Sequence, residues 1–168
     1  QGDMAFYAVL RRALGYSWFG HAKEQKFFVV IGSGGNGKGV LVRTVKAVLG
    51  QYAHAVAPNV LSRAYSGNPN SPSPALAALR HARFVVCTEM PAGLDEPFVK
   101  QFAGGDDLSA RQTYGDLVTF KPPGKLWLST NTMPEIEAND KAMWRRLVPL
   151  PFKASFRGAK VNRDLEAT

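Results

Sequence analysis

A glycine-rich segment with a single lysine, residues 32–39, is the part of the sequence whose residue types and spacing point most directly to chemistry. It fits the phosphate-binding pattern G-x-x-x-x-G-K-[ST] except at the last position, where Gly39 replaces the hydroxyl residue. Glycines let the backbone turn so that several N–H groups converge on a phosphate, and Lys38 brings a positive charge to the outer phosphates. The residues expected to bind the nucleotide are Gly32, Ser33, Gly34, Gly35, Asn36, Gly37, Lys38, Gly39 and Val40.

Gly39 affects the expected metal chemistry of this loop. The usual Ser or Thr at this position contributes a hydroxyl to Mg²⁺, so water or another side chain must fill that coordination position here. A glycine-rich turn with an incidental lysine is the alternative, but an apolar run precedes the segment and an amphipathic run follows it. The sequence therefore predicts nucleotide binding more directly than efficient hydrolysis.

Glu89 is the candidate acid for holding that Mg²⁺, because it follows the apolar run 84–87. Hydrolysis needs an acid at the tip of a neighbouring strand to hold the metal and orient the attacking water. The common pattern has two adjacent acids, and Thr88 takes the first place. We expect Glu89 to act alone or to share the task with Asp106 or Asp107. An ordinary exposed glutamate at a strand end is the alternative.

Two further polar positions could contact a nucleotide. Asn131 ends the apolar run 126–130, and its amide could hydrogen-bond the γ-phosphate or the attacking water. A turn-forming asparagine before Pro134 explains it nearly as well. Arg145 and Arg146 carry guanidinium groups that could stabilise a transferred phosphoryl group, even from a neighbouring subunit. Without other context they are a solvated pair or phosphate clamps.

The elements that must position these residues alternate between strands and helices. Three buried strands are predicted at 27–31, 84–87 and 126–130, and an extended stretch at 148–152. Helical segments are predicted at 4–14 (ending at Gly15), 41–49, 75–79, 96–103 and 142–147. Strands at 108–111 and 117–120 flank Gly115 and form a predicted β-hairpin, and residues 66–74 are predicted to be a surface loop. This order predicts a three-layer α/β domain with a central, mostly parallel sheet and an inserted hairpin.

Composition narrows the class of protein. The chain has 168 residues, is 45% hydrophobic and carries a net charge of +8, with basic ends and a slightly acidic middle. Basic ends suggest contact with a polyanion such as single-stranded DNA, although a solvated basic surface is the alternative. No apolar run approaches the length of a membrane helix, and the lone Cys87 fits a reducing cytoplasm. The chain begins with Gln1, so we expect it to be part of a longer protein.

Taken in order, these segments resemble the superfamily 3 helicase domain of phage and plasmid primases, related to the poxvirus primase–helicase type. The resemblance runs over nearly the whole chain. The segments that carry it are G-S-G-G-N-G-K at 32–38, R-F-V-V-C-T-E at 83–89, K-Q-F-A-G-G-D-D-L-S-A-R at 100–111, F-K-P at 120–122, K-L-W-L-S-T-N-T-M-P at 125–134, W-R-R-L at 144–147 and P-F at 151–152.

The resemblance implies an AAA+-like ATPase that forms a ring, usually a hexamer, around DNA. It makes residues 32–38 the Walker A loop, Glu89 the Walker B acid that meets the metal, and Asn131 sensor 1. Arg146, with Arg145 as second candidate, would be the arginine finger acting on the adjacent subunit. The implied cofactors are ATP and Mg²⁺. The candidate DNA-binding residues of the hairpin region are Arg111, Tyr114 and Lys121.

The resulting hypothesis is an ATP-dependent DNA helicase motor of a replicative primase–helicase from a phage, plasmid or integrated mobile element. Residues 1–26 would be an N-terminal helix and linker, 27–153 the motor core and 154–168 a tail. A primase domain is expected elsewhere in the full-length chain, and the cytoplasm of a bacterial or phage-infected host is the expected compartment. The alternative is a nucleotide-gated DNA-binding or initiator module with weak or no unwinding. A small-molecule kinase would leave the segment 104–121 without a role.

Overall fold

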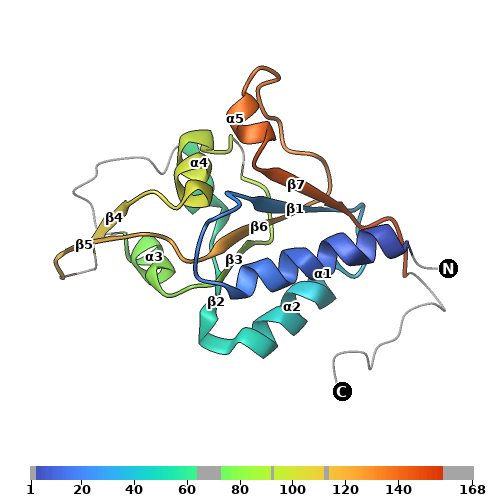
Figure 1. The fold of residues 1–168 in the computed structure, drawn as a ribbon, viewed down its shortest axis with the longest axis horizontal. Helices are drawn as coiled ribbons and strands as arrows, with labels where there is room; N and C mark the ends of the chain where they lie inside the picture. The colour runs from blue at the N-terminus through green and yellow to red at the C-terminus, as the bar shows by residue number, and fades with distance from the viewer. Residues whose placement is uncertain (1–2, 64–72, 92, 112–113, 157–168) are drawn as a thin grey trace.

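The computed structural model describes residues 3–63, 73–91, 93–111 and 114–156, which build an α/β domain around a five-stranded sheet (Figure 1). The strand order is β2-β3-β6-β1-β7, and all its pairings are parallel. Its strands are β1 (Phe27–Ile31), β2 (Ala53–Ala55), β3 (Phe84–Cys87), β6 (Lys125–Thr130) and β7 (Leu147–Pro151). The parallel arrangement confirms the predicted fold class, and its central strands are continuous apolar runs because both faces of the sheet are covered.

Helices cover both faces of the sheet. On one face lie α1 (Met4–Trp18) and α2 (Lys38–Leu49), which pack on alternate strand residues such as Phe28 and Trp127. On the other face lie α3 (Pro74–Ala77), α4 (Glu96–Gly104) and α5 (Lys141–Trp144). Residues of α4 and α5 pack there on the opposite set of strand residues, which includes Val29 and Leu128. The predicted three layers are therefore confirmed.

Because the strands are parallel, the sheet has two chemically different edges. Strand register places Cys87 of β3, Leu128 of β6 and Val29 of β1 level with one another. We call the edge where these strands end the carboxyl edge and the edge where they begin the amino edge. β1 has five residues and therefore separates the two edges by about 16 Å.

The predicted β-hairpin is confirmed between α4 and β6. Its strands β4 (Leu108–Arg111) and β5 (Leu117–Phe120) pair antiparallel and lie outside the main sheet. Figure 1 shows the hairpin projecting to the left, away from the ends toward which β1 and β7 point. It joins β6 through Gly124, where a Cβ atom would lie 2.6 Å from the backbone oxygen of Ala82. Only glycine fits this close approach.

Several predicted boundaries were wrong. α1 does not end at Gly15 but continues to Trp18, because Ser17 lies in the core and accepts a 2.9 Å hydrogen bond from Trp127 Nε1. α5 ends at Trp144 and not at 147, so that β7 begins at Leu147. The short strand β2 was not predicted.

Of the remaining predicted segments, one helix is confirmed, and two segments lie largely outside the residues that the structure describes. The helix expected at 75–79 is present as α3 followed by a 3₁₀ turn, Ala78–Arg80. Most of the expected loop at 66–74, and residues 157–168 of the expected tail, lie outside the described residues. Among the described helices, none is long and apolar enough to cross a membrane.

Candidate functional site

The glycine-rich segment forms a loop between the end of β1 and the start of α2, at the carboxyl edge. Gly34, Gly35 and Gly37 have φ values of 96°, 64° and 85°, which non-glycine residues rarely adopt. Among the described residues no side chain caps α2, whose N-cap is Gly37, so its first N–H groups can face a ligand. A loop of this kind at the N-terminus of a 12-residue helix suits an anion such as phosphate.

Lys38 connects this loop to the neighbouring strand. Its ammonium group donates to the backbone oxygen of Gly32 and lies 3.5 Å from Oδ1 of Asn131. Asn131 is exposed and directly follows β6, which pairs with β1. The structure therefore brings together the loop lysine and the polar strand tip that the sequence singled out separately.

Glu89 lies at the same edge, two residues beyond the end of β3. In register, Cys87 is level with Leu128, so Glu89 follows β3 at the level where β6 ends. Both Thr88 and Glu89 are exposed, whereas the Cys87 side chain is buried and donates to the backbone oxygen of Glu89 at 2.9 Å. Burial raises the pKa of the Cys87 thiol, which disfavours the reactive thiolate. The exposed Glu89 carboxylate is thus the more accessible of the two groups at this strand tip.

The surroundings of Gly39 are unusual for a magnesium site. A Cβ atom at Gly39 would lie 3.0 Å from Nη1 of Arg43, so a guanidinium covers the place of the expected hydroxyl residue. Among the described residues, no group of three or more His, Cys, Asp or Glu side chains could hold a metal ion. Mg²⁺ is commonly held by one or two carboxylates together with substrate phosphates and water. Glu89 therefore fits a magnesium ion that arrives with a nucleotide.

Asp106 and Asp107 do not lie near Glu89. They follow α4, and a Cβ atom on Gly104 would lie 3.0 Å from Asp106 Oδ2 and 3.8 Å from Arg146 Nη2. Arg146 immediately precedes β7, at the amino edge. Because about 16 Å of strand separates the edges, the expectation that either aspartate shares a metal with Glu89 in one subunit is wrong.

The two adjacent arginines have opposite environments. Arg146 is 8% exposed, donates to the backbone oxygen of Ala142 at 3.0 Å and lies 3.4 Å from Oε1 of Gln25. Burial lowers its pKa, and the neighbouring Arg145 adds to this effect. Arg145 is exposed, and in the described residues its hydrogen bonds use backbone groups: its N–H donates to the Lys141 oxygen at 3.1 Å, and its oxygen accepts from Lys26 Nζ at 2.5 Å. The second candidate is therefore the more accessible guanidinium.

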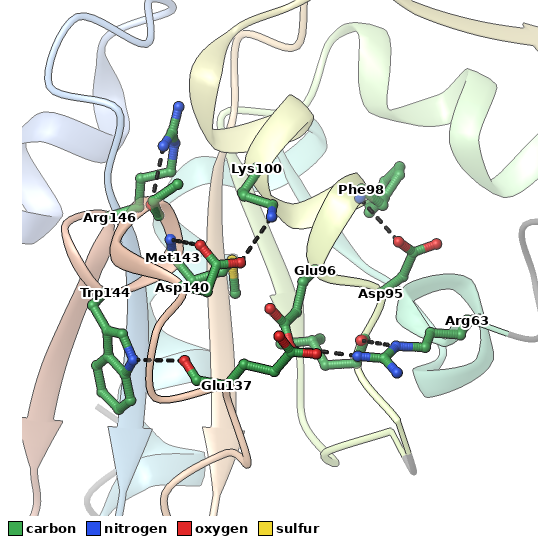
Figure 2. A network of polar contacts seen from close by, with 12 residues as sticks. Arg63, Asp95, Glu96, Phe98, Lys100, Glu137, Asp140, Met143, Trp144 and Arg146 are labelled. Carbon is green, nitrogen blue, oxygen red and sulfur yellow. Dashed lines mark hydrogen bonds and ion pairs between the residues drawn. The ribbon is translucent and has the colours of Figure 1, made fainter.

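A polar network holds α5, the helix that immediately precedes these arginines (Figure 2). Asp140 caps α5 by accepting from the Met143 N–H at 2.9 Å and pairs with Lys100 of α4 at 2.8 Å. The Lys100 hydrogen bond lowers the pKa of Asp140 to about 2. Burial, followed by the nearby Asp140 carboxylate, raises the pKa of Glu96, which also lies 3.5 Å from Arg63. This network fixes α5 against α4.

The hairpin residues differ in accessibility. Tyr114 is fully exposed and has a φ of 58°, an uncommon value for a bulky residue. Lys121, just after β5, is also exposed, whereas Arg111 is half-buried with its Nε enclosed. The segment between Arg111 and Tyr114 lies outside the described residues.

Comparison with known proteins is consistent with this geometry. Residues 30–146 match the family described as "Family of unknown function (DUF5906)". The chain belongs to the DUF5906 family. The matched part includes the glycine-rich loop 32–39, which we call the phosphate loop after its expected ligand, together with Glu89, the hairpin, Asn131 and both arginines.

Relatives of this DUF5906 chain carry further information. It is 35% identical over 139 residues to the Acanthamoeba polyphaga mimivirus protein named "Putative helicase L207/L206", covering 82% of this chain and 14% of that protein. Two apo structures of the NrS-1 C-terminal region have TM-scores of 0.64 at 15% and 17% identity, covering 92% of this chain and 36% of each. The second comparison shows the fold alone. Together they support a helicase-like domain with a P-loop NTPase-like core.

One part of the site lies outside the DUF5906 match and was not anticipated. After β7, residues 152–156 run back across the phosphate loop, and we call them the strap. Phe156 N–H donates to the Gly35 oxygen at 2.8 Å, and Asn36 Nδ2 donates to the Ala154 oxygen at 2.7 Å. Sequence could not reveal this, because the contact joins segments more than one hundred residues apart.

Proposed function

We propose that this domain is the ATP-hydrolysing motor of a replicative DNA helicase of superfamily 3, in a primase–helicase of a phage, plasmid or integrated mobile element. The observation that carries the proposal is the contact between Lys38 of the phosphate loop and Asn131 at the tip of β6. This contact supports the proposal because it brings a cation and an amide together beside the loop, as binding of an outer phosphate would require. The helicase name of the viral relative supports the same class.

In this proposal the carboxyl edge holds MgATP. The loop N–H groups and Lys38 would bind the phosphates, and Glu89 would hold Mg²⁺ and orient the attacking water. Asn131 would hydrogen-bond the γ-phosphate or that water. Mg²⁺ would supply charge neutralisation of the phosphates, while these side chains stabilise the charge that develops during transfer.

The amino edge would serve an adjacent subunit. An arginine beside the start of β7 is about 16 Å of strand away from its own phosphate loop. It can therefore act on a nucleotide only across an interface, which suits a ring, usually a hexamer. Accessibility favours Arg145 over Arg146 for this role, since Arg146 is buried and hydrogen-bonded within its own chain.

The hairpin would bind single-stranded DNA. Tyr114 is exposed and could stack on bases, and Lys121 could contact a phosphate. Arg111 is half-buried and is the less accessible candidate. Such contacts should weaken as salt concentration rises, because they release counterions from the DNA.

The test is ATP hydrolysis by the full chain with and without single-stranded DNA. DNA should stimulate turnover, and Glu89→Gln should retain nucleotide binding but lose turnover. Glu135→Gln, an exposed glutamate near the tip of β6, is the matched control and should behave like wild type. Absence of DNA-stimulated turnover in a full chain that forms rings would contradict a motor.

A second candidate is a nucleotide-gated DNA-binding or initiator module. It is favoured by Gly39, which supplies no hydroxyl to a metal and has the Arg43 guanidinium beside it. ATP would then act mainly as an assembly switch. This candidate predicts ATP-dependent assembly on DNA that Glu89→Gln leaves intact, without strand separation by the wild-type protein.

A further inference from the structure

A cavity of about 450 Å³ lies beside the phosphate loop, between the start of α1 and the strap. Its size falls in the range of about 300–1,000 Å³ typical of pockets that bury small ligands. Its walls include Asp3, Phe6, Asn36, Phe152 and Phe156. Asn36 belongs to the phosphate loop, so the cavity and the loop share a wall.

The position of the cavity along the sheet is informative. Glu89 and Asn131 follow β3 and β6, the loop follows β1, and the cavity lies beyond β7. Strand order β3-β6-β1-β7 therefore puts the cavity on the far side of the loop from the two candidate catalytic side chains. The tips of β6 and β7 are two strand spacings, about 10 Å, apart. An elongated ligand with its terminal phosphate over β6 would extend its other end toward this cavity.

The walls suit a flat aromatic group. Phe6 and Phe152 are packed edge to face with ring centroids 5.4 Å apart, and both rings are only partly buried. Phe156 is 50% exposed, and its ring lies 3.7 Å from the Cβ position of Gly37. Exposed aromatic side chains around a cavity provide stacking surface at little entropic cost.

The cavity also contains a carboxylate, that of Asp3, which could accept a hydrogen bond from the edge of a base. Asp3 is the N-cap of α1, and its Oδ1 accepts from Phe6 N–H at 3.0 Å. Within the described part of the chain, its second carboxylate oxygen has no hydrogen-bond partner. A carboxylate oxygen accepts from an exocyclic amino group but not from a base edge that lacks a donor.

Hydrogen bonds hold the strap to the end of β1 at one point and to the loop at two points. Phe152 N–H donates to the Ile31 oxygen at 2.7 Å, and the other two bonds involve Asn36 and Gly35. Asn36 is 6% exposed, so its hydrogen bond to the strap is buried. A group that fills the cavity would therefore press on the same segment that shapes the phosphate loop.

We propose that this cavity binds the purine base of the nucleoside triphosphate, with Asp3 accepting from the exocyclic amino group and Phe156 packing on the ring. The inference rests on the proposed nucleotide function of the loop. Asp3, Phe6 and the strap all lie outside residues 30–146, the part that matches the family. Base recognition would thus be supplied by segments that flank the matched core.

The test compares ATP with inorganic tripolyphosphate in calorimetric binding to the full chain with Mg²⁺. ATP should bind at least about tenfold more tightly, and Phe156→Ala should remove most of that difference while leaving tripolyphosphate binding unchanged. Tyr7→Ala, an exposed aromatic on α1 that does not line the cavity, is the control and should keep the difference.

A second arm addresses the amino group. Wild type should prefer ATP to purine riboside triphosphate, which lacks that group, and Asp3→Ser should lose this preference while retaining an N-cap. Equal binding of ATP and tripolyphosphate would overturn the base site but leave the phosphate site standing. Binding of neither would overturn the nucleotide function as well. A preserved ATP preference in Phe156→Ala together with Asp3→Ser would also overturn the assignment.

Discussion

Two polar side chains at the carboxyl edge of the sheet and two cations at its amino edge differ in accessibility. At the carboxyl edge Glu89 and Asn131 are exposed, as groups that await a ligand would be. At the amino edge the cations Lys125 and Arg146 are buried, and both donate to backbone oxygens. Residue type alone therefore does not separate ligand-binding groups from structural ones; accessibility and existing partners do.

Lys125 is the clearest example of a charged residue with a structural role. It is 2% exposed, donates to the backbone oxygens of Phe19 and Pro123 at 2.9 and 3.0 Å, and lies 4.6 Å from the Tyr16 ring centroid. Burial lowers its pKa to about 8, and the positive charge of Arg83 adds to this. One ammonium group thus ties the α1–β1 linker to the segment that leaves the hairpin.

The largest effect should come from the carboxyl edge. Lys38→Ala removes the ammonium group that lies beside Asn131, so ATP turnover by the full chain should fall below detection. Lys46→Ala changes an exposed lysine of the same helix and should leave turnover near wild type. Steady-state hydrolysis measures both. Equal turnover in the two variants would contradict a ligand-binding role for Lys38.

The next largest effect should distinguish the roles of the two adjacent arginines. Arg145→Ala should lower turnover by about 10³-fold or more, as for loss of an arginine finger, with little change in unfolding free energy. Arg146→Ala should instead lower the free energy of unfolding by about 1–3 kcal/mol, because it removes a buried, hydrogen-bonded group. Thermal and chemical denaturation provide the second measurement.

Mixed rings test the direction of this effect. Combining Arg145→Ala subunits with Glu89→Gln subunits should restore part of the turnover, since some interfaces then contain both intact groups. If mixing restores nothing, Arg145 does not act across an interface. If Arg146→Ala folds normally and mixes productively, the assignment of the two arginines is reversed.

A smaller effect concerns pH and the amino edge. Between a pKa of about 8 in the folded protein and 10.5 in the unfolded chain, Lys125 has lost its proton only in the folded state. The unfolded chain then binds more protons, so this residue makes the free energy of unfolding rise with pH across that window. Lys125→Met should reduce that slope in denaturant titrations between pH 8 and 10. An unchanged slope would mean that Lys125 remains charged in the fold.

The smallest effect is expected from Gly39→Ser. The new hydroxyl could join the magnesium shell after the flexible Arg43 side chain moves from its 3.0 Å approach. We expect a few-fold lower Mg²⁺ concentration for half-maximal nucleotide binding. Gly39→Ala presents the same Cβ without the hydroxyl and should show no such gain. Identical behaviour of the two variants would mean that position 39 does not face the metal.

Local patterns explain what could be predicted from the sequence. The apolar runs at 27–31 and 84–87 became central strands, since burial on both faces of a parallel sheet needs little more than such runs. The tight turns of the glycine-rich loop at 32–39 were predictable because glycines adopt positive φ values readily. The hairpin followed from two short strands around Gly115.

Contacts between distant segments explain what could not be predicted. The extension of α1 past Gly15 depends on the Ser17–Trp127 hydrogen bond. Arg146 is buried where it contacts Gln25 and Ala142. The adjacent Arg145 has the same residue type but is exposed. The strap is held by hydrogen bonds with Gly35 and Asn36, and no local sequence pattern predicts these contacts.

The close approach at Gly124 has a mechanical consequence. Its backbone lies against Ala82, and the ammonium group of the next residue, Lys125, donates to the backbone oxygen of Pro123, so the chain is closely held where it leaves the hairpin. The hairpin beyond it is a lever, since the four residues of β5 extend about 13 Å toward Tyr114. A rotation of the hairpin about this point would therefore displace Tyr114 farther than the residues beside Gly124.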